Sequence, residues 1–247
     1  MNASHSERVL LLTGASRGIG HAAVKIFSDH GWRVLTISRH PFDVRCPWKG
    51  GERNHIQLDL SRIDNVHAAL PRIRDSANGR LDALINNAAI SPKTAAGGKI
   101  SSLEMGYEDW LHVFNVNFFA PLVLVQGLRD HLVASRGSVV NMTSIVGSRV
   151  HPFASAAYAT SKAALAALTR EMAADLGGAG VRVNAVSPGE IETAILSAGT
   201  ASIVEQSIPM RRVGQPQEVA ELLYFLCSER ASYITGSEVH IDGGQQV

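Results

Sequence analysis

The segment Arg8–Gly20, RVLLLTGASRGIG, decides the fold of this chain. Branched apolar residues typical of a covered strand run directly into a loop that contains Gly14, Gly18 and Gly20. A strand-to-helix turn without Cβ atoms lets the backbone approach a pyrophosphate at the N-terminus of the following helix. The spacing is GxxxGxG, and an ordinary turn is the alternative. We therefore expect a dinucleotide site at the end of the first strand.

Short apolar runs alternate with longer helical stretches in the rest of the chain. Helices are predicted over 18–30, 62–77, 108–134, 156–176 and 216–228. This order predicts an α/β fold: a single domain over 1–247, with a doubly wound parallel sheet of about seven strands and helices on both faces. The predicted strands are Arg8–Leu12, Arg33–Ser38, His55–Leu58, Ala83–Asn86, Gly137–Met142, Arg182–Val186 and Glu238–Ile241.

Three long loops are predicted over 39–54, 90–107 and 188–215. Loops that follow the carboxyl ends of strands in such a sheet usually line the ligand crevice. Ordinary surface loops are the alternative, most of all for 39–54.

Composition excludes several classes of protein. The 247 residues include 23 Lys or Arg and 22 Asp or Glu, a net charge of +1 that does not favour a nucleic-acid partner. Ten histidines occur without HExxH or CxxC spacing, so no metal site is predicted.

No membrane partner is expected, because the longest apolar runs, VLLL at 9–12 and PLVLV at 121–125, are too short to span a bilayer. The polar start MNASHSER lacks the apolar core of a signal peptide. The two cysteines, Cys46 and Cys227, lie far apart in the sequence, so we expect a reducing, cytoplasmic location.

Residues at the end of the second strand predict the choice of cofactor. An NAD-binding fold usually places Asp or Glu there, whereas this chain has Ser38 followed by Arg39, with Arg17 in the glycine loop. Two guanidinium groups would bind a ribose 2′-phosphate, so NADP(H) is favoured over NAD(H). The alternative is that Arg39 faces solvent. Asp59, after the third strand, is placed to accept from an adenine amino group, and Asn86–Ala89 follows the fourth strand.

Tyr158 and Lys162 are spaced i, i+4 in AAYATSKAALAAL and therefore lie on one helix face. A free tyrosine, with a pKa of about 10, is a poor acid at neutral pH, and a neighbouring ammonium group is expected to lower that pKa. A structural pair is the alternative for an isolated YxxxK.

Further motifs accompany this pair in order along the chain: NNAA at 86–89, Asn117, Ser144, SPGEIET at 187–193 and SYITGSEVHIDGG at 232–244. With TGASRGIG and YxxxK, this ordered set resembles the short-chain dehydrogenase/reductase family over about residues 8–246. The resemblance implies a Rossmann-like fold and an enzyme that transfers hydride between a nicotinamide and a carbonyl or secondary alcohol.

The resemblance also implies roles for residues. Tyr158 is the acid/base, Lys162 holds the nicotinamide ribose, Ser144 bonds the substrate oxygen, and Asn117 holds a water that links Lys162 to solvent. Asn115, two residues before Asn117, is expected to have a structural role only. The implied catalytic set is Asn117, Ser144, Tyr158 and Lys162. The implied cofactor-binding set is Gly14, Ser16, Arg17, Gly18, Ile19, Gly20, Ser38, Arg39, Asp59, Leu60, Asn87, Ala88, Tyr158, Lys162, Pro188, Gly189, Ile191 and Thr193.

Three details depart from the family pattern: NNAA stands where NNAG is usual, loop 90–107 is expanded, and the Ser144–Tyr158 interval is one residue longer than in many relatives. The loop around His151–Phe153 is therefore expected to alter the substrate mouth. These differences concern the substrate and leave the catalytic set complete.

The substrate stays open at this stage. The pattern is closest to 3-oxoacyl-carrier-protein reductases, but LGGAG at 176–180 lacks the basic residues that an acidic carrier protein would favour. An NAD-dependent sugar, polyol or steroid-type alcohol dehydrogenase is the alternative. A catalytically idle cofactor sensor would require a broken Ser/Tyr/Lys set, and this set is complete.

The segment VFNVNFFAPLVLV at 113–125 is apolar nearly all round. Such a helix must be covered on more than one side, which predicts a homo-oligomer, a tetramer or else a dimer. The alternative is a monomer in which the domain itself buries the helix.

Overall fold

Seven parallel strands form one sheet in the computed structural model, which describes residues 7–43, 48, 50–193 and 200–247. Their order across the sheet is β3-β2-β1-β4-β5-β6-β7, and every neighbouring pair is parallel. The predicted fold class is confirmed. The strands are β1 (Val9–Thr13), β2 (Arg33–Ser38), β3 (His55–Gln57), β4 (Ala83–Asn86), β5 (Ser138–Met142), β6 (Arg182–Pro188) and β7 (Glu238–Ile241).

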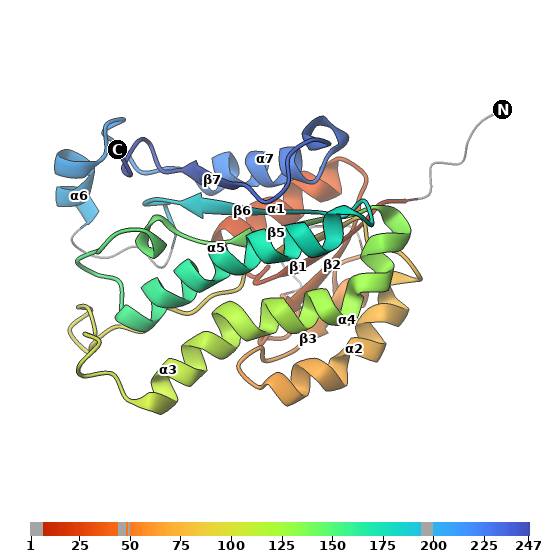
Figure 1. Cartoon of the computed structure of the whole chain (residues 1–247), viewed down its shortest axis with the longest axis horizontal. Helices are drawn as coiled ribbons and strands as arrows, with labels where there is room; N and C mark the ends of the chain where they lie inside the picture. Colours follow the sequence, from red (N-terminus) through yellow and green to blue (C-terminus); the bar gives the residue numbers. More distant parts are fainter. Residues whose placement is uncertain (1–6, 44–47, 49, 194–199) are drawn as a thin grey trace.

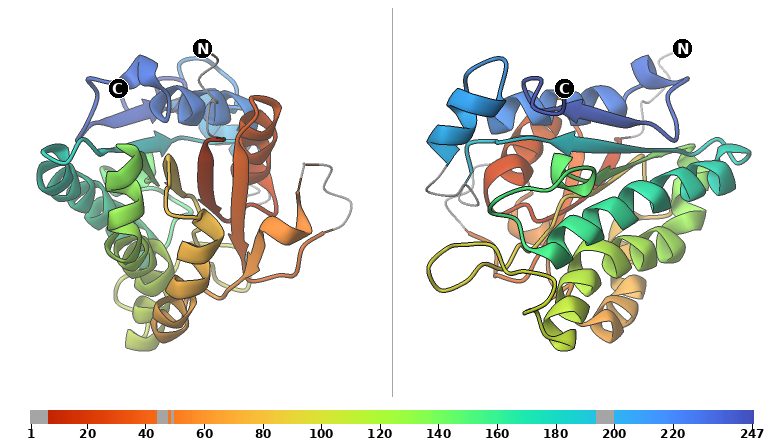
Figure 2. Two further views of the ribbon diagram at one scale, coloured as in Figure 1. Left: turned by 90° about the vertical axis from the view of Figure 1, so that its right-hand side faces the viewer. Right: turned by 60° about the vertical axis from the view of Figure 1, so that its left-hand side comes forward.

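Helices cover both faces of the sheet (Figure 1). On one face lie α2 (Ile63–Ala77), α4 (Ala120–Ser135) and α5 (Ala156–Gly177), and on the other lie α1 (Gly18–Asp29) and α7 (Pro216–Leu226). Figure 2 shows the two layers on either side of the twisted sheet. The predicted loop at 188–215 contains a short helix, α6 (Thr200–Ser207), which the sequence analysis did not predict.

Alternate residues of each strand enter two different cores, as the pleat requires. In β1, Leu11 packs toward α2, α4 and α5, whereas Leu10 and Leu12 pack toward α1 and α7. Both sets are fully buried, which explains why β1 is apolar without alternation.

The order of the strands reverses direction between β1 and β4. The chain moves outward from β1 to β2 and β3, then returns to β4 on the other side of β1. In an open α/β sheet, this reversal leaves a crevice beyond the carboxyl ends of the strands, where ligands bind. β6 and β7 point toward the left end of the molecule in Figure 1, where α6 and the loop 90–107 lie. Residues 90–93 of that loop line the crevice.

One long helical segment replaces the predicted helix at 108–134. It consists of α3 (Tyr107–Phe114), a wide π-turn (Asn115–Phe119) and α4. In the π-turn, the Ala120 N–H donates to the Asn115 carbonyl five residues back. Such turns insert one extra residue in a helix and often lie at functional sites.

The segment Tyr107–Ser135 is also apolar enough to span a bilayer by length and composition, with a mean hydropathy of 1.5 in its most apolar window. Polar residues interrupt the apolar runs of this segment, so no single run predicted this property. Half of that window is buried within the fold. A core helix of a folded domain passes the same test, and α4 packs here against α2 and the sheet.

Candidate active site

The glycine loop joins β1 to α1 and forms one end of the crevice. Gly14 has φ of +72°, and a Cβ atom there would lie 2.8 Å from the Ala88 Cα. At Gly20 a Cβ would lie 2.1 Å from the Gly14 carbonyl oxygen. A larger residue at either position would have to move the backbone. The glycines therefore allow the loop to pack closely on itself and on the backbone that follows β4.

Asn87 and Thr13 hold this loop in place. The Asn87 Nδ2 donates to the carbonyl oxygens of Thr13 and Gly14, both at 3.0 Å. The Thr13 Oγ1 accepts in turn from the N–H groups of Asn87 and Ala88, also at 3.0 Å. Four hydrogen bonds thus connect the ends of β1 and β4, the two strands that flank the reversal in strand order.

The side chains expected to contact the adenosine lie around the ends of β2 and β3. Ser38 donates to the His40 carbonyl at 2.8 Å, and the Arg39 side chain is exposed at the rim. Asp59 accepts from the Ser61 N–H at 2.9 Å, and this bond lowers the pKa of Asp59, with smaller contributions from the positive charges of Arg39 and His112. The lowered pKa keeps Asp59 ionised, so its carboxylate can accept a hydrogen bond from an adenine amino group.

Tyr158 and Lys162 lie one turn apart on α5. Ser155 caps the N-terminus of this helix, and its Oγ accepts from the Tyr158 N–H at 3.4 Å. The Lys162 side chain is 2% exposed, and its Nζ donates to the Met142 carbonyl at 2.6 Å. The Nζ lies 5.6 Å from the centroid of the Tyr158 ring. Burial lowers the pKa of Lys162 to about 7.

The direction of the Tyr158 pKa shift corrects the sequence analysis, which expected it to be lowered. Burial raises the pKa of Tyr158, the hydrogen bond with Ser144 opposes that rise, and the negative charge of Glu190 adds to it. The buried Lys162 gives up its proton near neutral pH, so in the protein alone it supplies less positive charge than an exposed lysine would.

Asn117 is fully buried in the π-turn and braces two other segments. Its Oδ1 accepts from the Ile90 N–H at 2.9 Å, and its Nδ2 donates to the Ile90 carbonyl and to the Ser161 Oγ, both at 3.0 Å. The wide turn thus joins the loop after β4 to the helix that holds Tyr158. Asn115 points elsewhere and donates to the Ser61 carbonyl at 2.9 Å.

A single cavity of about 820 Å³ connects the glycine loop to Ser144 and Tyr158. The predicted site residues line it, with two exceptions: Gly20, which faces the Gly14 carbonyl in the first turn of α1, and Asn117, which is fully buried. Gly189 forms one wall, where a Cβ would lie 2.7 Å from the Asp242 Cβ. Among the described residues, no group of three His, Cys, Asp or Glu side chains could hold a metal ion.

The structure adds cavity residues that the sequence analysis did not assign. His112 lies near Asp59, and His151, Phe153 and Glu190 lie at the substrate end. The longer Ser144–Tyr158 interval pointed to the His151–Phe153 loop, whereas Glu190 carried no signal beyond its place in SPGEIET.

Comparison with known proteins agrees with this geometry. A family model described as enoyl-(acyl carrier protein) reductase matches residues 14–246. The chain belongs to the short-chain dehydrogenase/reductase family. The predicted enzyme class is thereby confirmed at the level of an oxidoreductase of this family.

Relatives within the short-chain dehydrogenase/reductase family include Protein FixR of Bradyrhizobium diazoefficiens, 54% identical over 97% of this chain and 87% of the relative. The 3-oxoacyl-[acyl-carrier-protein] reductase FabG of Thermotoga maritima is 34% identical over 96% and 97%. An oxidoreductase from Brucella ovis, solved with a partially ordered NAD, is 53% identical, with a TM-score of 0.82 and coverage of 96% of this chain and 100% of that one.

Proposed function

We propose that the chain is an NADP(H)-dependent oxidoreductase that interconverts a carbonyl compound and a secondary alcohol, with Tyr158 as the acid/base. The observation that carries this proposal is the shared cavity, which has the glycine loop at one end and Ser144, Tyr158 and Lys162 at the other. The NAD-bound relative supports a nicotinamide dinucleotide, and the two arginines at the adenosine end support the phosphorylated form.

The residues of the cavity fit such a cofactor. The missing Cβ atoms of the glycine loop leave room for a pyrophosphate at the N-terminus of α1, and Asp59 is ready to accept from an adenine amino group. Asn87, Ala88, Pro188, Gly189, Ile191 and Thr193 line the path from there to Tyr158. When bound, the nicotinamide supplies or accepts the hydride.

The proton is handled by the chain itself. In the reducing direction, the Tyr158 hydroxyl donates its proton to the carbonyl oxygen while the Ser144 hydroxyl donates a hydrogen bond to the same oxygen. Lys162 then favours the phenolate that remains, because an ammonium group stabilises a nearby anion. The reverse proton movement applies to alcohol oxidation.

The test is an initial-rate assay with a panel of ketones and alcohols and with both cofactors. Turnover would reject the alternative of an idle cofactor sensor, and a strong NADH preference would favour the NAD-dependent alcohol dehydrogenase alternative. A 3-oxoacyl substrate is supported by the FabG relatives, whereas sugars, polyols and steroid-type alcohols remain the second substrate group.

The preference for NADPH should depend on Arg39. A hydrogen bond between charged groups contributes about 1.5–3 kcal/mol, which corresponds to roughly tenfold to hundredfold. Exposure of Arg39 moves the expected effect to the low end of that range. We therefore expect Arg39→Ala to reduce the kcat/KM ratio of NADPH over NADH by about tenfold, while exposed Arg72→Ala on α2 leaves it unchanged. A wild type that prefers NADH would contradict the assignment, and an unchanged ratio would leave Arg17 alone at the phosphate.

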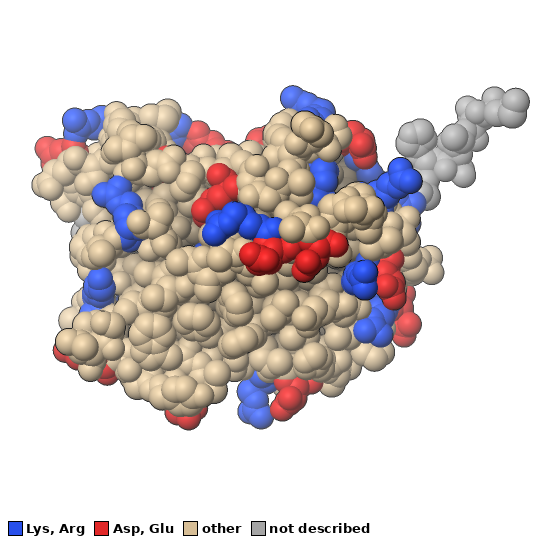
Figure 3. All heavy atoms as spheres, viewed as in Figure 1, with Lys and Arg blue, Asp and Glu red and all other residues tan. Residues whose placement is uncertain are grey.

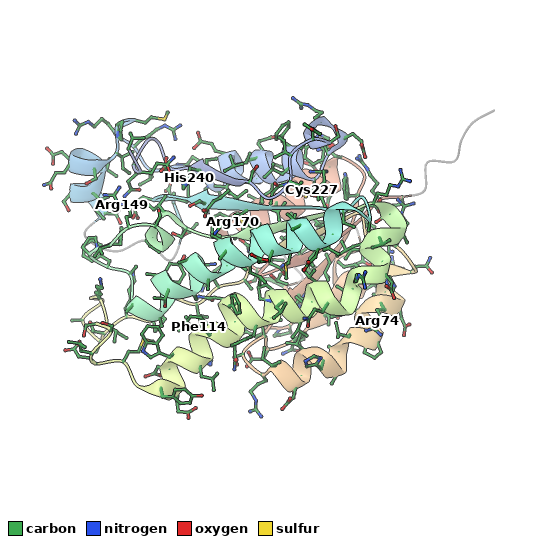
Figure 4. All side chains as sticks on the ribbon, viewed as in Figure 1. Arg74, Phe114, Arg149, Arg170, Cys227 and His240 are labelled. Carbon is green, nitrogen blue, oxygen red and sulfur yellow. The ribbon has the colours of Figure 1, made fainter. Side chains whose placement is uncertain are left out.

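We also propose a homo-oligomer, most simply a tetramer, that covers α3, α4 and α5. Figure 3 shows a broad surface without charged side chains over the junction of α3 and α4, bordered by a cluster of charged side chains over α5. Figure 4 places Phe114 on the uncharged surface and Arg170 in the bordering cluster. Phe119, at the end of the π-turn between α3 and α4, is 37% exposed and contacts Phe118 edge-on. Light scattering at micromolar concentration should give a mass of several times 26.4 kDa. A monomer would show that the fold needs no partner there, and Phe119→Glu should shift an oligomer toward smaller species.

For location we propose the cytoplasm, without a nucleic-acid or membrane partner. Support comes from the nearly balanced charge and from Cys227, a free and buried thiol. Cys46, the other cysteine of that argument, lies outside the described residues.

A further inference from the structure

The strongest unassigned feature is an interaction between two loops at the substrate end, the His151–Glu190 pair. His151 comes from the loop between β5 and α5, and Glu190 from the loop after β6. The His151 Nε2 lies 2.9 Å from the Glu190 Oε1, and the two side chains are only 10% and 13% exposed. Both line the cavity that contains Tyr158. Figure 4 places Arg149, two residues before His151, at the end of the molecule where α6 lies.

The hydrogen bonds of His151 indicate which ring nitrogen accepts and which donates. The Phe153 N–H donates to the His151 Nδ1 at 3.2 Å, so this nitrogen carries no proton. We therefore assign Nε2 as the donor to Glu190. Both ring nitrogens are thus occupied, and His151 has no polar atom left for a substrate.

Glu190 is in the opposite situation. Within the described part of the chain, its carboxylate receives one hydrogen bond, from the His151 imidazole at Oε1, which leaves Oε2 for another donor. A carboxylate that is largely withdrawn from water is stable only when more of its lone pairs are satisfied. Its negative charge also raises the pKa of Tyr158, so the carboxylate lies close to the reacting group.

We propose that Glu190 is a specificity-determining residue, whose free oxygen accepts a hydrogen bond from a hydroxyl group that the substrate carries near its reacting carbon. The substrate class is then a diol or hydroxy ketone. His151 is a positioning residue, which holds the carboxylate in one orientation through its Nε2 proton. This inference rests on the proposed oxidoreductase function.

The rest of the cavity wall is compatible with a short polyol carbon chain. Phe153, Val146 and Ala154 provide apolar contacts beside the pair. The negative charge of Glu190 disfavours a negatively charged substrate. Because Lys93 also lines the cavity, the experiment includes an anionic probe. A saturated acyl chain would leave the Oε2 of Glu190 without a donor.

The experiment compares kcat/KM for alcohol oxidation with five probes. 2-Butanol has no second donor, whereas 2,3-butanediol and 1,3-butanediol carry a second hydroxyl at two different positions. 1-Amino-2-propanol carries an ammonium group in its place, and 3-hydroxybutyrate carries a negatively charged carboxylate. We expect one of the diols to exceed 2-butanol by about tenfold or more, the value of a hydrogen bond to a charged acceptor. Glu190→Leu should abolish that preference, and Glu190→Gln should reduce it while keeping an acceptor for His151.

Glu192→Gln is the matched control, because Glu192 lies two residues away, does not line this cavity and accepts from Gln215 at 2.7 Å. It should leave the preference unchanged. Binding is measured separately by calorimetry in Tyr158→Phe with cofactor bound, where adding Glu190→Leu should weaken the diol by the same factor. For His151, we expect His151→Phe to raise KM for the diol with kcat and 2-butanol kinetics unchanged, and His151→Gln, which keeps a donor, to restore it.

Several results would overturn the inference. Equal kcat/KM for 2-butanol and both diols, or a diol preference that survives Glu190→Leu, would reject Glu190 while leaving the oxidoreductase function intact. A preference for 3-hydroxybutyrate would show that the site takes anions, and a preference for 1-amino-2-propanol would replace the hydroxyl with an ammonium donor. If no alcohol or ketone reacts with either cofactor, the proposed function fails and this inference fails with it.

Discussion

Tyr158→Phe should lower kcat by about 10²–10⁴, the usual contribution of a general acid. The substitution removes the hydroxyl that bonds Ser144 and leaves the aromatic ring and its contacts in place. Cofactor affinity, measured by fluorescence titration, should stay within about threefold, because the ring and Lys162 still line the cavity.

The control is Tyr233→Phe, since the Tyr233 side chain is fully exposed. It should behave like the wild type. A Tyr158→Phe enzyme with near-wild-type kcat on a good substrate would remove Tyr158 from the role of acid, and would make the neighbouring Ser144 hydroxyl the next candidate.

Lys162→Met should reduce both turnover and nicotinamide-nucleotide affinity, each by at least about tenfold. The methionine keeps an unbranched stem and removes the charge that favours the phenolate of Tyr158 and the hydrogen bond to the ribose. The measurement is kcat as a function of pH together with the Kd for NADPH. Lys25→Met, at an exposed surface ion pair with Asp29, is the control. A variant with unchanged Kd and an unchanged pH profile would reject the double role.

The same substitution has a separate readout in stability without cofactor. Burial lowers the pKa of Lys162 to about 7, against 10.5 for an ordinary lysine, so between these values the unfolded chain binds the extra proton. The contribution of Lys162 to the free energy of unfolding therefore rises with pH from about 7 to 10.5, by at most about 1.4 kcal/mol per pH unit. Lys162→Met should flatten this part of the stability curve, even if the enzyme is inactive.

Much of the fold could be predicted because its signals are local. The unbroken apolar run of β1 and the glycines after it predicted a covered parallel strand and a tight turn, and both are present. α6 was missed because small polar residues around 197–202 have weak helix propensity. The π-turn was missed because the residues around it are apolar on every side, so the extra residue leaves no visible shift in the pattern.

The site was predictable where its parts follow one helix or one loop, as for Tyr158 and Lys162. The pKa of Tyr158 was not, because its shift depends on burial by segments distant in sequence. The His151–Glu190 pair joins residues 39 positions apart, and no spacing rule connects them. The same holds for the contact of Asn117 with Ile90, which spans 27 positions.

The wide turn at Asn115–Phe119 makes the function of this helix depend on the number of residues in the turn as well as on their identity. Successive residues of an α-helix are rotated by about 100°. The wide turn absorbs its extra residue, so deleting one residue would convert it to an ordinary α-turn and leave α3 and α4 nearly in their present orientation. Side chains within the turn would instead shift by up to that angle, and Asn117 would no longer reach both Ile90 and Ser161. A relative whose alignment has a one-residue gap here would lose the brace between the β4 loop and α5, although every remaining letter, Asn117 included, was identical.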